Sequence, residues 1–251
     1  MSRSNRHIDR CTRHWLCILV ISIVSTGVMS QGTCLAEKLP EWTKNIRLDH
    51  PRLFFNSETW PAVRKRALGD ERQWYLGIKG RVDELLKRTA NKDALETREY
   101  GREAAWSAFV YRVTGEKRYL ELAGKCIDAS LRSYDECFRE KRSVNWYSTS
   151  RVHTTLAWDW LYEDLPERQR RDFMSRIVNA IDRVLKARPA IYRENMSGYN
   201  TGFYGVRNCL WFIGCTAFGT GIEEERVSEW LVWGRNENMK MLEHRRKACG
   251  D

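Results

Sequence analysis

Residues 195–214, NMSGYNTGFYGVRNCLWFIG, place amides, tyrosines and an arginine directly before an apolar run. If a helix has begun by residue 200, four polar side chains fall near one of its faces. They are Asn200, Tyr204, Arg207 and Asn208. Amide and guanidinium groups donate hydrogen bonds to anions, and a phenol can exchange a proton, so these residues could line a cleft together. The alternative is that Asn200 or Thr201 caps the helix and the tyrosines pack under a loop.

The sequence contains no short motif that is typical of a metal site or of a cofactor-binding site. There is no CxxC or HExxH spacing, and no GxGxxG, phosphate loop or GxSxG. After residue 36 only five cysteines remain, an odd number that excludes a complete set of disulfides. Cys126, Cys209 and Cys215 lie within apolar helical patterns, where a thiol usually packs as a small hydrophobic group. We therefore expect no metal site and no cofactor.

The elements that must position these residues are predicted to be helices, because apolar residues recur at helical spacing and alternating strand patterns are nearly absent. The stripes comprise Trp74, Ile78, Val82, Leu85 and Leu86; Trp106, Phe109, Val110 and Val113; and Phe173, Ile177, Ile181 and Leu185. Ser57 is a candidate N-cap for one helix, and Asp164 with Glu167 resembles a capping box for another.

A larger regularity groups the helices into pairs. A helix, a short turn and a second helix recur three times, with turns at Gly115, Leu165 and Gly221 that lie 50 and 56 residues apart. Successive helical hairpins of this kind bury their apolar faces against their neighbours. Either an open solenoid or a ring whose inner helices surround a cleft satisfies the pattern, so the predicted fold class is all-α.

The first 36 residues are expected to be a secretory signal. Four arginines precede an apolar run from Trp15 to Met29, and cleavage is predicted after Ala36. An uncleaved membrane anchor is the alternative. The remaining chain, residues 37–251, holds 39 basic and 32 acidic residues, a net charge of +7. For a protein exported to the periplasm or the extracellular space, this excess favours acidic polysaccharides or membrane surfaces as partners over nucleic acid.

Four segments resemble, in order, the N-terminal (α/α) toroid domain of the heparinase II/III-like polysaccharide lyases. They are HPRLFFNSETWPAVRKRAL, AFVYRVTGEKRYLELA, LAWDWLYEDLPERQRRDF and GYNTGFYGVRNCLWFIGCTAFGTG, within residues 49–248. The resemblance implies an incomplete toroid of helical hairpins. In this family a β-sandwich follows the toroid, and the present sequence contains none. We expect the chain to be the N-terminal part of a longer lyase, or a split or frameshifted remnant of one, and to be inactive alone.

The activity implied by the resemblance is β-elimination on a polysaccharide that contains uronic acid, such as a glycosaminoglycan. Removing the proton next to a carboxylate places a second negative charge beside the first, so a hydrogen-bond donor must neutralise the carboxylate. The resemblance makes Asn200 the candidate neutralising residue. In the family the tyrosine that exchanges the proton lies in a later segment that this sequence does not contain. Tyr204 is the catalytic candidate because helical spacing places it on the face of Asn200, and Tyr199, Arg207 and Asn208 are candidates for binding substrate. Several relatives carry a histidine beside the amide, where this chain has Tyr199.

The resemblance also assigns substrate contacts to the segment before the LAWDWLY helix, which borders the cleft in a toroid. Arg151 could pair with a uronate or a sulfate, Trp146 could stack on a sugar ring, and His153 lies beside them. The alternative for all three is a role in the core or in helix capping.

Two other classes of function stay open. Asp159, Glu163 and Asp164 could serve as the paired carboxylates of a glycosidase on the same scaffold, although Glu163 and Asp164 more simply end one helix and begin the next. A helical carbohydrate-binding or interaction scaffold is the third class. Neither the particular polysaccharide nor the oligomeric state follows from the sequence.

Overall fold

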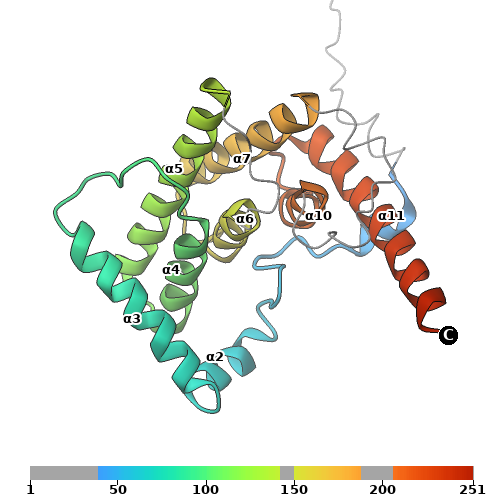
Figure 1. The fold of residues 1–251 in the computed structure, drawn as a ribbon. Coiled ribbons are helices and arrows are strands. Elements are labelled where there is room, and N and C mark those ends of the chain that lie inside the picture. Colours follow the sequence, from blue (N-terminus) through green and yellow to red (C-terminus); the bar gives the residue numbers. More distant parts are fainter. Residues whose placement is uncertain (1–38, 142–149, 188–205, 251) are drawn as a thin grey trace, which may run out of the picture. The chain divides into compact units, whose positions relative to one another are not determined.

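The computed structural model describes residues 39–141, 150–187 and 206–250, so the expected signal segment lies outside it. Within these ranges the chain is helical and contains no strand, as the sequence predicts (Figure 1). The elements are η1 (Glu41–Asn45), α2 (Trp60–Leu68), α3 (Arg72–Thr89), α4 (Gly101–Thr114), α5 (Lys117–Arg139), α6 (Ser150–Trp160), α7 (Glu167–Ala187), α10 (Val206–Ala217) and α11 (Glu224–Cys249).

The three predicted hairpins are present as α4–α5, α6–α7 and α10–α11. Gly115 ends α4 with φ +74°, and Gly221 lies between α10 and α11 with φ +70°. These left-handed conformations favour glycine because it has no side chain to clash with the backbone. Both glycines therefore lie at turns between helices, as the sequence predicts.

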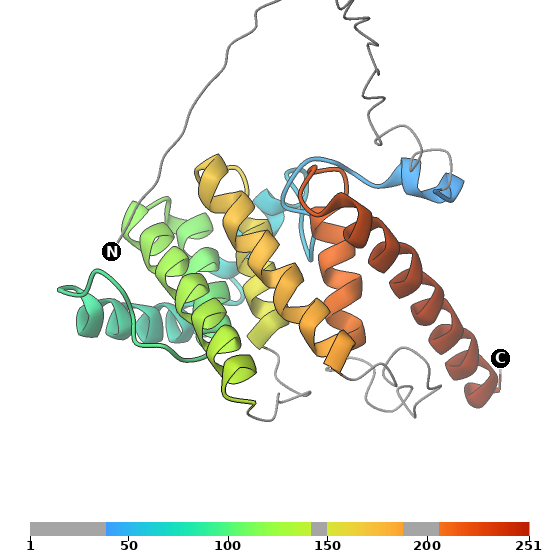
Figure 2. The same ribbon diagram turned by 90° about the horizontal axis from the view of Figure 1, so that it is seen from above.

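Helices α4, α6 and α10 form an inner row of parallel helices (Figures 1 and 2). A side chain at Gly101 would place its Cβ 2.1 Å from the carbonyl oxygen of Ser150, so α4 and α6 begin side by side. Toward their other ends, the rings of Phe109 and Trp160 lie 6.0 Å apart. Helices α6 and α10 share an apolar cluster that contains Leu156 and Phe212.

Helices α5, α7 and α11 return antiparallel to the inner row and are linked by ion pairs. Arg176 of α7 contacts Asp128 of α5 at 2.9 Å, and Arg226 of α11 contacts Asp182 of α7 at 3.4 Å. The core lies between the two rows. Its largest fully buried side chains include Trp158, Trp230, Tyr119, Met174, Leu210 and Ile213.

The predicted apolar stripes are mostly confirmed, with one error. Val82 and Leu85 are buried, but Trp74 leaves 76 % of its surface exposed. Helix α3 packs against α2 and α4, and Trp74 lines a shallow groove that these three helices share, so most of its ring stays in contact with solvent. Helical spacing identifies a face, but it does not say how far the neighbouring helices extend over it.

Both predicted caps are wrong. The amides of Glu58 and Thr59 donate to Oδ1 of Asn56 just before α2, while the hydroxyl of Ser57 donates to Asp49. The short side chain of Asn56 suits such a local turn. The carboxylate of Asp164 accepts a hydrogen bond from the hydroxyl of Tyr111, 2.8 Å away on α4, which occupies it away from the start of α7.

Candidate functional site

A buried aspartate joins the two sequence motifs that best characterise the chain. Asp159, near the end of α6, is fully buried. Its carboxylate accepts hydrogen bonds from His50 Nδ1 at 2.7 Å and from the backbone amides of Arg52 and Leu53, both at 2.9 Å. A charge buried away from water requires such partners, because the alternative costs several kcal/mol. We call these four residues the Asp159 junction.

The side chain of Arg52 extends the junction to α10. Its guanidinium donates to the carbonyl oxygens of Thr216 at 3.1 Å and Phe218 at 2.7 Å, at the end of that helix, and to Leu48 at 2.7 Å. The last carbonyls of a helix have no partner within the helix, and a cation there also interacts favourably with the helix dipole. Arg52 is therefore a C-terminal cap supplied by a distant segment.

Two aromatic rings pack against the imidazole of His50. Its ring stacks on Tyr162, with ring centroids 3.7 Å apart, and meets Trp158 edge to face at 5.7 Å. Burial lowers the pKa of His50, and the hydrogen bond to Asp159 only partly opposes this effect. The imidazole is therefore neutral at pH 7, with its Nδ1 proton donated to Asp159. Its buried Nε2 has no hydrogen-bond partner.

The junction was missed in the sequence, although a signal for it exists. The run LAWDWLY places one carboxylate among apolar residues, where it must be buried and therefore paired. The segment HPRLFF supplies the donors. The two motifs thus form one structural unit that ties the loop before α2 to α6 and α10.

The predicted substrate site belongs at the opposite end of the inner row, where α6 and α10 begin. Arg151 lies in the first turn of α6 with only 6 % of its surface exposed. Its guanidinium lies 4.4 Å above the ring of Tyr134, and its buried Nε lacks a hydrogen-bond partner. His153, two residues further along α6, is partly buried. Arg151 is therefore packed among side chains, and its predicted role in binding substrate stays a prediction.

The other predicted site residues cannot be placed. Trp146, Tyr199, Asn200 and Tyr204 lie outside the described residues. Arg207 and Asn208 belong to the first turn of α10, but their side chains are not described. Leu156 of α6 and Phe212 of α10 belong to one apolar cluster, and each lies six residues after the first residue of its helix, so the first turns of α6 and α10 lie at the same end of the row. The two predicted segments therefore lead into helices that begin close together.

The structure argues against the carboxylates of the glycosidase alternative. Asp159 is fully buried with three donors on its oxygens, so it cannot reach a sugar. Asp164 is engaged by Tyr111 and lies 3.7 Å from Arg112. Glu163 is exposed. A glycosidase needs two carboxyl groups across one bond of the substrate, and these residues do not supply them.

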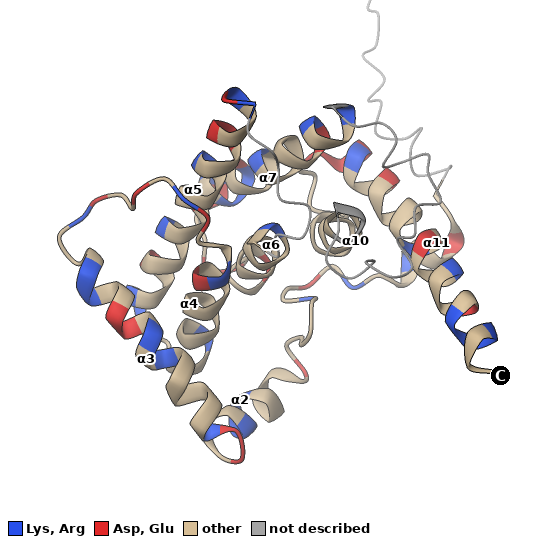
Figure 3. Cartoon of the chain, in the orientation of Figure 1, with Lys and Arg blue, Asp and Glu red and all other residues tan. Residues whose placement is uncertain are grey.

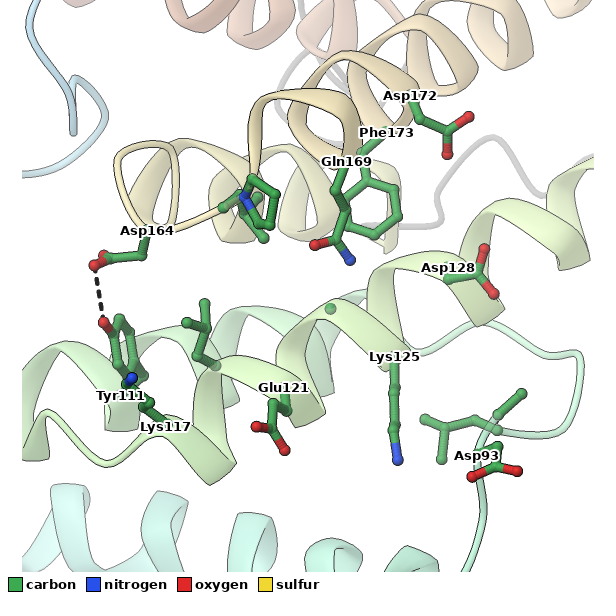
Figure 4. Close-up of a pocket in the computed structure, with 16 residues that line it drawn as sticks. Asp93, Tyr111, Lys117, Glu121, Lys125, Asp128, Asp164, Gln169, Asp172 and Phe173 are labelled. Atoms are coloured by element: carbon green, nitrogen blue, oxygen red, sulfur yellow. Dashed lines mark hydrogen bonds between the residues drawn. The ribbon is translucent and has the colours of Figure 1, made fainter.

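A groove of about 770 Å³ lies on the outer side, between α5 and α7 (Figure 4). Gln169 and Phe173 of α7 point toward α5 across it. Its lining contains five carboxylates and two lysines. The carboxylates are Asp93, Glu121, Asp128, Asp164 and Asp172. An acidic lining repels a polyanion, so this groove does not suit an acidic polysaccharide.

Charged side chains are concentrated on the outer helices, whereas α6 and α10 carry few (Figure 3). In the part of the chain that the structure describes, no three His, Cys, Asp or Glu side chains are grouped to hold a metal ion. Over the same residues, no helix has the length and the apolar composition needed to cross a bilayer.

Comparison with known proteins identifies no relative. No model of a protein family, no curated protein and no solved structure matches this chain.

Proposed function

We propose that the chain is the toroid part of an exported polysaccharide lyase that acts by β-elimination on a polysaccharide containing uronic acid. In this proposal α4, α6 and α10 are inner helices of an incomplete (α/α) ring. The observation that carries it is the Asp159 junction, because it makes HPRLFF and LAWDWLY, the two most specific motifs of the resemblance, parts of one structural unit.

The arrangement of the inner row supports a site at its N-terminal end. Helices α6 and α10 pack together and begin at the same end of the row, so the segments that carry Trp146 and Asn200 lead into neighbouring helices. The free N–H groups at helix starts and the helix dipole favour anions, which suits a uronate.

Each proposed residue has one chemical task. Asn200 donates a hydrogen bond to the uronate carboxylate, so that negative charge can spread into it as the neighbouring proton leaves. Tyr204 exchanges that proton. Tyr199, Arg207 and Asn208 bind the sugar chain, and Trp146, Arg151 and His153 border it. The net positive charge of the chain favours the approach of a polyanion.

The test is to incubate the purified chain with heparin, chondroitin sulfate and alginate and to follow the ultraviolet absorbance of the unsaturated product. Binding of the same polymers is measured in parallel at rising salt, because salt screens attraction to a polyanion. We expect salt-sensitive binding that Asn200→Ala weakens, and any absorbance increase to be lost in that variant. Asn236→Ala, an exposed amide on α11, is the matched control.

The outcomes separate the three classes of function. Cleavage of a neutral polysaccharide without ultraviolet absorbance would indicate a glycosidase. Failure to bind any of the three polymers would leave the helical scaffold as the better description. Equal effects of Asn200→Ala and Asn236→Ala would contradict the role proposed for Asn200.

A further inference from the structure

A second groove, of about 640 Å³, runs along α10 and α11 beneath the segment that contains η1. Its apolar lining includes Trp42, Trp211, Leu231, Met239, Met241 and Leu242. Three arginines also line it, Arg47, Arg52 and Arg235, and its lining contains no carboxylate. We call this surface the α11 groove. It lies outside the residues proposed for polysaccharide cleavage.

The exposed part of the groove follows one face of α11 from Arg235 to Leu242, and the same face continues beyond the groove to Arg246. Residues 235, 239, 242 and 246 are spaced at three or four positions, so they form a continuous stripe. Met239 and Leu242, in its middle, leave 51 % and 53 % of their surfaces exposed. Arg235 and Arg246 lie at its two ends. The stripe therefore has an apolar centre between two cations.

Helix α11 is longer than α10, so part of this stripe lies beyond the start of α10. Gly214 faces Leu231, and Gly234 faces Trp211, with distances that leave no room for a side chain at either glycine. This antiparallel register places residue 239 opposite Val206, the first residue of α10. Leu242 and Arg246 consequently lie beyond the start of α10, and the last turns of α11 are exposed.

The charges at both ends of the stripe are uncompensated. The guanidinium of Arg235 lies 4.7 Å from the ring of Trp42, and no carboxylate of the described chain pairs with Arg235 or Arg246. The neighbouring lysines differ, because Lys240 pairs with Glu237 and Lys247 pairs with Glu243, both at 2.8 Å. Two unpaired arginines around exposed methionine and leucine match the composition of protein interfaces, which are rich in Trp, Met and Arg.

We propose that the α11 groove binds a polypeptide segment that has apolar side chains at its centre and carboxylates at both ends. A second copy of this chain fits poorly, because pairing the stripe antiparallel with itself would bring Arg235 against the Arg246 of the other copy. A polyanionic sugar chain would engage the arginines but leave Met239 and Leu242 uncovered. An acidic segment with an apolar centre satisfies both features.

The probe for this proposal is a fluorescein-labelled helical peptide with leucines along one face and glutamates at both ends. Its anisotropy is measured with the full chain. Two sister peptides carry serine in place of leucine or lysine in place of glutamate. We expect saturable binding of the first peptide only, because the groove requires both the apolar contacts and the charges.

Paired variants locate the binding. Arg235→Gln with Arg246→Gln, and separately Met239→Ser with Leu242→Ser, should each weaken binding by roughly tenfold or more, which corresponds to about 1.4 kcal/mol. Lys240→Gln with Lys247→Gln removes the same charge from paired lysines and should change binding little. Circular dichroism of each variant verifies that the helices are intact.

Four results would overturn the proposal. The first is no saturable binding of the leucine–glutamate peptide, and the second is equal binding of the serine peptide. The third is heparin binding that needs the arginines but not Met239 and Leu242, which would indicate a site for polyanions. The fourth is self-association of the chain that Met239→Ser with Leu242→Ser abolishes, which would indicate a second copy. None of these four results tests cleavage by the proposed lyase site, so one proposal can be wrong while the other stands.

Discussion

The imidazole of His50 and the carboxylate of Asp159 lie 2.7 Å apart, although 109 residues separate them in the sequence. Both side chains are buried. The contact joins the loop before α2 to the middle of the core, and Arg52 carries the connection on to the end of α10. The stability of the helix row therefore depends on a polar contact as well as on apolar packing.

Replacing Asp159 with asparagine should destabilise the fold strongly. An amide has one acceptor oxygen. In the place of Oδ2 that oxygen keeps the bonds from the amides of Arg52 and Leu53, but the NH₂ group then faces Nδ1 of His50. The ring must move its proton to the buried Nε2, which has no partner. Leaving a buried donor without a partner costs about 1–3 kcal/mol, so we expect a loss of about 2–3 kcal/mol once the lost negative charge is included. Urea unfolding followed by circular dichroism measures it. Asp172→Asn, which removes an exposed carboxylate on α7, should cost under about 1 kcal/mol; similar losses in both variants would contradict the account.

Stability should fall as the pH drops below the ordinary pKa of histidine. Burial lowers the pKa of His50 in the folded chain, so the unfolded chain takes up this proton first. The contribution of His50 is thus fully present above about pH 6.5 and decreases at lower pH by up to about 1.4 kcal/mol per pH unit.

The measurement for this pH effect is the urea midpoint at about pH 7.5 and about pH 5.5. In His50→Asn the amide nitrogen can still donate to Asp159 but does not titrate, so the difference between the two midpoints should shrink. The idea fails if wild type and variant lose the same stability on acidification.

Two glycines set the spacing of α10 and α11. A Cβ at Gly214 would lie 2.6 Å from the Cα of Leu231, and one at Gly234 would lie 2.9 Å from the Cα of Trp211. Backbone atoms cannot move aside as a flexible side chain does. Gly214→Ala should therefore cost about 2–3 kcal/mol in thermal or urea unfolding, through strain in the core.

Helix α3 offers the matched control for this glycine prediction. A Cβ at Gly77 or Gly80 meets no atom within 4 Å. Gly77→Ala should stabilise the chain by roughly 0.5–1 kcal/mol, because alanine loses less backbone entropy in a helix. If Gly214→Ala proved as benign as Gly77→Ala, the close approach of α10 and α11 would be refuted.

Thiol labelling should distinguish the buried cysteines from the exposed one. Burial raises the pKa of Cys209 to about 11 and that of Cys215 to about 12, which disfavours the reactive thiolate. Cys249 is exposed at the end of α11. In native protein, Cys249→Ser should remove one fast-reacting thiol from the reaction with a disulfide reagent, whereas Cys209→Ser should remove a thiol seen only after unfolding. The reverse order of reactivity would contradict the packing of α10.

The sequence predicts the helical class and the hairpins because both depend on local features. Helical spacing of apolar residues identifies Phe173 and Ile177 as core, and both are buried. Glycine at Gly115 and Gly221 marks turns whose backbone conformation it favours. The two tryptophans of LAWDWLY, Trp158 and Trp160, are two positions apart and so lie on different faces of a helix; Trp158 is fully buried and Trp160 is partly buried.

Features that depend on distant partners could not be predicted in the same way. Nothing near Trp74 indicates that its side of α3 stays open. The caps of α2 and α7 were misassigned because Ser57 and Asp164 bind partners outside their own helices. Asp159 was considered only as a possible catalytic carboxylate, because its hydrogen-bond donors come from a segment more than 100 residues earlier in the sequence. The predicted site falls largely on residues whose side chains are not described, so its roles stay predictions.

The Asp159 junction and the starts of α6 and α10 occupy opposite ends of the same helices. A change in length or sequence just before Ser150 or Val206 would therefore leave the hydrogen bonds of Asp159 untouched. The starts of α6 and α10 could therefore change during evolution while the contacts that stabilise the helix row at the other end stay the same. Under the lyase proposal, such changes would allow the bound polysaccharide to vary on one helical scaffold.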